Sequence, residues 1–204
     1  MTSLESLSWH FSPWVPKFAD TFWDSITSPY TEVRLAISDN LRYLSEMRLH
    51  PSFPSTEAFL EACHSRNGMQ LLVSVDKEYV ERIDKLVKSL EHWRSIRKPF
   101  AKDAVQPYDA ACLTVLTWLW ASMNDFRVTM VYPFVERLLP ELMHMQDIQD
   151  NLELQKWASV VLATMAALPY PASMVPAVLE SLLDLFKSPS WRTRLAVLPL
   201  LQGM

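Results

Sequence analysis

Three basic residues near the middle of the sequence have the types and spacing to bind an anion. Arg94, Arg97 and Lys98 lie close together at the end of the segment DKEYVERIDKLVKSLEHWRSIRK, with Lys88 before them and Lys102 after them. One interpretation is structural, because positive charge near the end of a helix complements the helix dipole. The functional alternative is a site for a phosphorylated metabolite or an acidic segment of a partner.

Sequence patterns typical of enzymes are missing. The five histidines are scattered and form no HxxxH or HExxH pair of the kind that binds zinc. The phosphate-binding pattern GxxxxGK[ST] and the nucleophile pattern GxSxG do not occur, and the chain has only two glycines from which to build such loops. We therefore predict no enzymatic activity, no catalytic residue, no cofactor and no metal site.

Two distant segments share a pattern that begins a helix. SPYTEVRLAI starts at Ser28 and SPSWRTRLAV starts at Ser188, an offset of 160 residues. Serine followed by proline is typical of a helix start. An arginine follows each serine by six residues, at Arg34 and Arg194. We expect these arginines to bond to carbonyl or carboxylate groups of a neighbouring helical unit.

Looser copies of this pattern point to a repeat architecture. They begin at Gln106 and Asp150, so the four starts are separated by 78, 44 and 38 residues. These spacings are near multiples of about 40 residues, the period of HEAT and armadillo helix pairs. Such pairs stack because one pair alone cannot bury both of its apolar faces. The alternative is that two unrelated amphipathic helices share the same capping residues.

The composition predicts an all-α fold of about nine helices. Half of the residues are hydrophobic, and two glycines against fourteen prolines disfavour hairpin turns and favour frequent helix boundaries. We expect a HEAT- or armadillo-like α-solenoid segment that occupies residues 1–204. Apolar stripes at helical spacing predict helix pairs over residues 12–50, 55–99, 104–145 and 149–186, with an incomplete last pair over 188–204.

Charge, apolar runs and cysteines limit the classes of partner. The net charge is −4, which offers no general attraction to a phosphate backbone, so we predict no direct nucleic-acid binding. The most apolar run, residues 110–123, is shorter than the ~20 residues that cross a bilayer, so we predict no membrane partner. Cys63 and Cys112 stand apart without a CxxC motif, which indicates reduced, buried thiols.

The two patterned segments resemble segments of the Blm10/PA200 family of proteasome activators. SPSWRTRLAVLPLLQ is similar to a family segment in which Ser-x-Trp-(Lys/Arg)-x-Arg leads into a helix, and SPYTEVRLAISDNLRYL is similar to a second one. The resemblance covers residues 28–44 and 188–202 and has the family's order and separation. It implies a long HEAT-repeat solenoid that caps the 20S proteasome, docks on its α-ring and promotes peptide degradation without ATP. It also implies histone degradation, DNA repair and a nuclear and cytoplasmic location.

One departure from the family limits what the resemblance implies. Family members end in a hydrophobic-Tyr-x tail that opens the proteasome gate, whereas this sequence ends in LQGM. We therefore expect a piece of solenoid wall from the C-terminal part of such a protein, with 20S and histone contacts made by the complete protein. In this wall, Arg34, Trp191 and Arg194 would pack between repeats. The alternative function is a generic HEAT-repeat adaptor.

Overall fold

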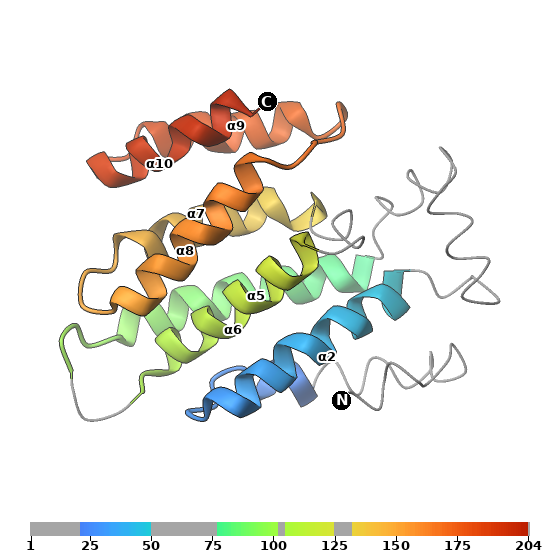
Figure 1. Ribbon diagram of the computed structural model, residues 1–204, viewed down its shortest axis with the longest axis vertical. Coiled ribbons are helices and arrows are strands. Elements are labelled where there is room, and N and C mark those ends of the chain that lie inside the picture. Colours follow the sequence, from blue (N-terminus) through green and yellow to red (C-terminus); the bar gives the residue numbers. More distant parts are fainter. Residues whose placement is uncertain (1–20, 50–76, 102–104, 125–131, 204) are drawn as a thin grey trace.

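A computed structural model describes residues 21–49, 77–101, 105–124 and 132–203 of the chain (Figure 1). These residues form helices and contain no strand, which confirms the predicted all-α class for the described part. Residues 21–24 are helical, and seven further helices have defined bounds. They are α2 (Thr31–Leu49), α5 (Lys77–Ile96), α6 (Pro107–Met123), α7 (Tyr132–Asp147), α8 (Leu152–Ala166), α9 (Val175–Phe186) and α10 (Trp191–Gln202). The predicted helix starts near residues 12 and 55 lie outside the described residues.

The helices stack in two layers. One layer contains α2, α6, α8 and α10 in that order, and the other contains α5, α7 and α9. Across the layers, α5 packs on α6, α7 on α8, and α9 on α10. Figure 1 shows that the stack follows the chain, from α2 at one end to α9 and α10 at the other. No helix in the described ranges is long and apolar enough to cross a membrane.

Consecutive helices pair differently from the predicted bounds. The expected pairs joined α6 to α7 (104–145) and α8 to α9 (149–186), whereas the closely packed neighbours are α5–α6, α7–α8 and α9–α10. The connectors 148–151 and 187–190 are short, so they turn the chain back at once and bring the flanking helices together. Helix α10 therefore completes a pair with α9. Among the described helices, α6 and α8 lie between α2 and α10 in their layer, so three steps from one helix to the next cover the 160-residue offset.

The repeated Ser-Pro pattern forms a turn before the helix. The hydroxyl oxygens of Ser28 and Ser188 accept hydrogen bonds from the amides two residues later, at 3.4 Å and 3.2 Å. These local bonds hold the chain in a turn, so α2 and α10 begin at the third residue after each serine and not at the proline. Ser190 is the N-cap of α10, where its side chain accepts from the amide of Thr193.

Buried polar groups join α6 to the unit before it. The Thr114 hydroxyl lies 3.0 Å from the Ile26 carbonyl oxygen, and the Ser38 hydroxyl lies 3.0 Å from the Thr114 carbonyl oxygen. The rings of Trp23 and Trp118 meet edge to face, with centroids 5.8 Å apart. Apolar burial supplies most of the attraction between these helices, and the directional contacts fix how α2 and α6 sit against each other.

Gly203 allows α10 to end close to α8. A methyl group on its Cα would overlap the carbonyl oxygen of Ala166. We predict that Gly203→Ala lowers the free energy of unfolding by about 2 kcal/mol, because one helix end must shift to accommodate the added carbon. Urea denaturation followed by circular dichroism measures this loss. The neighbouring, exposed Gln202→Ala is the control and should change stability by less than about 0.5 kcal/mol. Equal stability of the two variants would contradict the steric explanation.

Candidate functional site at the helix connectors

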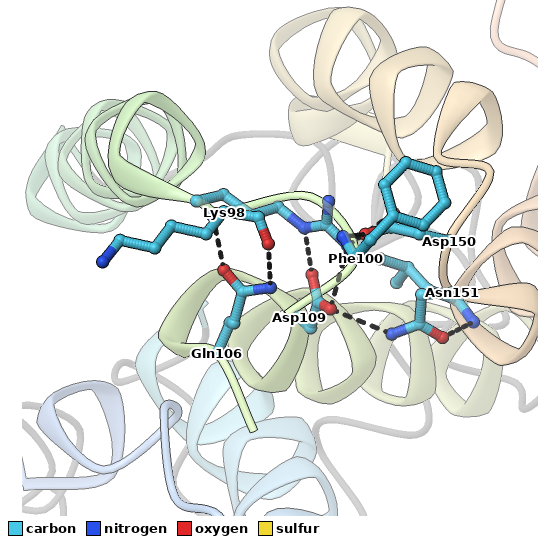
Figure 2. Close-up of polar contacts among 8 residues, drawn as sticks. Lys98, Phe100, Gln106, Asp109, Asp150 and Asn151 are labelled. Carbon is cyan, nitrogen blue, oxygen red and sulfur yellow. Dashed lines mark hydrogen bonds and ion pairs between the residues drawn. The ribbon is translucent and has the colours of Figure 1, made fainter. Parts of the chain in front are cut away.

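A polar network joins the connectors of two successive helix pairs (Figure 2). Arg97, just after α5, donates from Nε to Asp109 Oδ1 at 2.7 Å and from Nη2 to Asp109 Oδ2 at 3.1 Å. Its Nη2 also donates to Asp150 Oδ1 at 2.9 Å. The three side chains are only 8%, 12% and 8% exposed, respectively. One guanidinium therefore links α5, the first turn of α6 and the α7–α8 connector.

Two amide side chains complete the network. Asn151 is the N-cap of α8: its Oδ1 accepts from the amide of Leu154, and its Nδ2 donates to Asp109 Oδ2 at 3.1 Å. Gln106 bonds twice to the backbone of Lys98, accepting from its amide at 2.7 Å and donating to its carbonyl at 2.9 Å. These contacts fix both ends of the connector between α5 and α6, as Figure 2 shows.

The charges in this network are stable at neutral pH. Burial alone would lower the pKa of Arg97, but hydrogen bonds from its guanidinium to Asp109 and Asp150 raise that pKa above its ordinary value. Burial alone would raise the pKa of Asp150, but the bonds that it accepts from Arg97 and the amide of Phe100 lower it. Arg97 and Asp150 therefore both stay ionised at neutral pH and form an internal ion pair.

Phe100 has an unusual backbone and an exposed ring. Its φ is 61°, in the left-handed region that costs a residue with a side chain about 1 kcal/mol or more. Its amide donates to Asp150 Oδ2 at 2.5 Å, which holds the connector in this conformation. The side chain is 73% exposed. The network therefore presents an aromatic side chain at the tip of the connector.

The three residues of the predicted anion site occupy different environments. Arg94 reaches across to α7, where its Nη1 donates to Glu141 Oε2 at 2.8 Å. Arg97 binds the two aspartates, and the contacts found for Lys98 are those of its backbone with Gln106. The chain's own carboxylates thus bind both guanidinium groups, and the two arginines serve to connect helices.

Sequence reasoning did not identify the carboxylates that pair with Arg97. Asp109 and Asp150 do lie in QPYDAACL and DNLELQKWAS, the two looser copies of the helix-start pattern. The pattern thus indicated that both residues lie near the start of a helix. Their pairing depends on two connectors that lie together in space, and Asp150 is 53 residues from Arg97 in the chain. Residue spacing within a short segment cannot predict a contact between side chains this far apart in the chain.

The two pattern arginines make the same local contact. Arg34 Nη1 donates to the Ser28 carbonyl at 2.9 Å, and Arg194 Nη1 donates to the Ser188 carbonyl at 2.8 Å. Arg34 also donates to the Thr31 hydroxyl. Each arginine therefore closes the turn before its own helix, whereas the pattern had suggested contacts with a neighbouring unit. The shared contact makes the turns before α2 and α10 alike, although Arg34 is buried and Arg194 is exposed.

Trp191 lies on the surface in the described structure. Its side chain is 62% exposed, and the guanidinium carbon of Arg192 lies 5.5 Å from the centre of its ring. Together with Leu195, it lines a groove between α8 and α10. The predicted packing of Trp191 between repeats is therefore not seen among the described residues.

Cysteine and metal chemistry add little to the site. Cys112 is fully buried and forms no disulfide with any described residue, and burial raises the pKa of its thiol well above the ordinary value. Cys63 lies outside the described residues. In the part of the chain that the structure covers, no group of three or more His, Cys, Asp or Glu side chains is arranged to hold a metal ion.

The fold and the connector network define an all-α protein whose stacked helix pairs are joined at their connectors. Comparison with protein-family models, curated proteins and solved structures gave no match to this chain.

Proposed function

We propose that this chain is a scaffold segment of a Blm10/PA200-type activator of the 20S proteasome. The observation that carries the proposal is the equivalence of α2 and α10. Their starts hold the two segments that resemble the family, they lie in the same layer, and Arg34 and Arg194 bind the same carbonyl of the preceding turn. A scaffold built of repeats needs such equivalent helix starts, because each unit must present the same face to the next.

A HEAT- or armadillo-like α-solenoid is the architecture that we propose for this scaffold. The two-layer stack supports it, since α6 and α8 pack on both of their neighbours in one layer, α7 packs on both of its neighbours in the other, and the pairs α5–α6, α7–α8 and α9–α10 meet across the layers. The second helices of three successive pairs begin at Pro107, Leu152 and Trp191, which are 45 and 39 residues apart. These distances are close to the period of about 40–47 residues in HEAT and armadillo repeats.

In this role the chain shapes a surface and performs no reaction. The ion pairs of Arg94 and Arg97 connect neighbouring helices and would hold the curvature of the scaffold. The complete protein would contact the 20S α-ring, and histones would be among its degradation targets. Its location would be the nucleus and cytoplasm.

The proposal is tested with the protein encoded by the complete reading frame that contains this chain. We expect it to copurify with 20S particles and to raise their hydrolysis of a fluorogenic peptide in the absence of ATP. The 20S particle alone and the isolated 204-residue chain are the controls, and neither should show stimulation. Absence of both copurification and stimulation would overturn the proposal and favour the generic HEAT-repeat adaptor.

A further inference from the structure

The α8–α10 groove combines apolar side chains with positive charge. It has a volume of about 590 Å³, within the range of binding pockets in proteins. Val160, Trp191 and Leu195 line it and are exposed to solvent. Trp191 and Leu195 lie one helical turn apart, so they form one ridge along the groove. Exposed aromatic and aliphatic side chains grouped in this way are typical of interaction sites.

The charges in the groove favour an acidic partner. Lys156 and Arg192 line it, and no carboxylate is among the described residues that do so. Among the residues that the structure describes, the Nη1 atom of Arg192 is buried and no acceptor binds it. A buried cationic donor without an acceptor is unfavourable, and a carboxylate that reaches it would remove this cost.

Helix α9 carries a surface that complements this groove. Leu179, Leu183 and Phe186 form an exposed apolar stripe at four- and three-residue spacing. Glu180 and Asp184 each follow one of the leucines by one position, so they run along the edge of the stripe and are exposed. A narrow apolar stripe with acidic residues along one side matches a groove with an apolar ridge and two cations.

We propose that a second copy of this chain binds in the α8–α10 groove through its α9 helix. In this interface the leucines of α9 contact Trp191 and Leu195, while Glu180 and Asp184 face Lys156 and Arg192 of the other copy. The inference goes beyond the scaffold role and does not depend on proteasome binding.

One internal contact bears on the energetics of this interface. Lys187 Nζ lies 2.6 Å from Asp184 Oδ1, but the two side chains are 76% and 68% exposed. An ion pair so open to water is weak, so Asp184 can exchange it for a more buried cation in the groove. Burial of Trp191, which protrudes from α10, supplies the apolar part of the attraction.

The test is a charge-reversal experiment on the 204-residue chain, followed by sedimentation equilibrium. We expect the unmodified chain to self-associate reversibly in the micromolar range. The double variant Glu180→Lys/Asp184→Lys and the double variant Lys156→Glu/Arg192→Glu should each weaken self-association by about tenfold or more. Mixing the two variants should restore association, because the reversed charges again face opposite signs. Trp191→Ser should weaken association without any change in charge.

The control Glu136→Lys/Glu153→Lys has the same change in net charge as the α9 variant but alters exposed residues outside the groove lining. It should associate as the unmodified chain does, and circular dichroism should show that all variants keep their helices. A chain that stays monomeric at about 100 µM, or association that neither charge reversal weakens, would overturn the proposal. Failure of the mixed variants to associate would also overturn it. Binding of an acidic helix from another protein with no self-association would assign the groove to that partner.

Discussion

Replacing Arg97 by alanine is expected to lower the free energy of unfolding by about 3–5 kcal/mol, the usual loss when one partner of a buried ion pair is removed. The variant leaves the carboxylates of Asp109 and Asp150 buried, at 12% and 8% exposure, without their shared cation. It also loosens the link between the α5–α6 and α7–α8 pairs. Urea denaturation followed by circular dichroism gives the difference in free energy. If the variant does not fold, Arg97→Lys keeps the charge but not the forked geometry, and should lie between it and the unmodified chain.

Arg137→Ala is the matched control for this prediction. Arg137 Nε donates to Asp84 Oδ1 at 2.8 Å, between α7 and α5, but the two side chains are 37% and 47% exposed. Water screens a pair of this kind, so the loss should stay within about 1 kcal/mol. Equal losses for Arg97→Ala and Arg137→Ala would show that the buried network does not stabilise the stack.

A dependence of stability on pH is the second large expected effect, and it arises from Glu141. Its side chain is buried, and its Oε2 accepts a hydrogen bond from Arg94. Burial raises the pKa of Glu141 from an ordinary 4.5 to about 7, and the charge of Arg94 only partly opposes this shift. The folded protein therefore holds a proton that the unfolded chain has released between these two pH values.

The sign of the effect follows from this difference in protonation. The contribution of Glu141 to stability is fully present below pH 4.5 and is lost as the pH rises through about 7. A shift of this size corresponds to at most about 3 kcal/mol. Glu141→Gln has nearly the same shape but no titration, so its stability should lack this decrease. Subtracting the two pH profiles, measured by urea denaturation from pH 4.5 to 8.5, isolates the effect.

Other titrating groups near Glu141 should cancel in this subtraction. Burial, together with the charge of Arg94, lowers the pKa of His144, so its contribution to stability is lost as the pH falls and has the opposite sign. Burial raises the pKa values of Tyr108 and Cys112 beyond the measured range. A constant difference between the two profiles would contradict the prediction, because it would mean that Glu141 titrates normally in the folded protein.

Local features of the sequence predicted the helical class well. Spacing of apolar residues and the positions of proline indicated helices at the described positions of α2 and α5 to α10, since helix formation depends on residues three and four apart. The repeated pattern at Ser28 and Ser188 also predicted equivalent helix starts. In both cases the helix begins two residues after the proline, because the serine hydroxyl first holds the chain in a turn.

Tertiary structure changed the interpretation of the charged residues. By spacing alone, Arg94 and Arg97 were candidates to bind an external anion. The structure brings Glu141 to the first and Asp150 to the second, from 47 and 53 residues away. Trp191 differs from its prediction in the opposite direction. It was expected to pack between repeats, but its side chain is exposed and lines a groove.

The sequence by itself determined that the described chain is helical and roughly where its helices lie, because backbone hydrogen bonds, capping and amphipathic spacing act over a few residues. Only the tertiary structure decided which helices form pairs, which carboxylates meet Arg97, and which apolar stripes remain uncovered. These features depend on contacts between residues far apart in the chain. Such contacts form only when the connectors have brought whole helices together, so no short segment contains them.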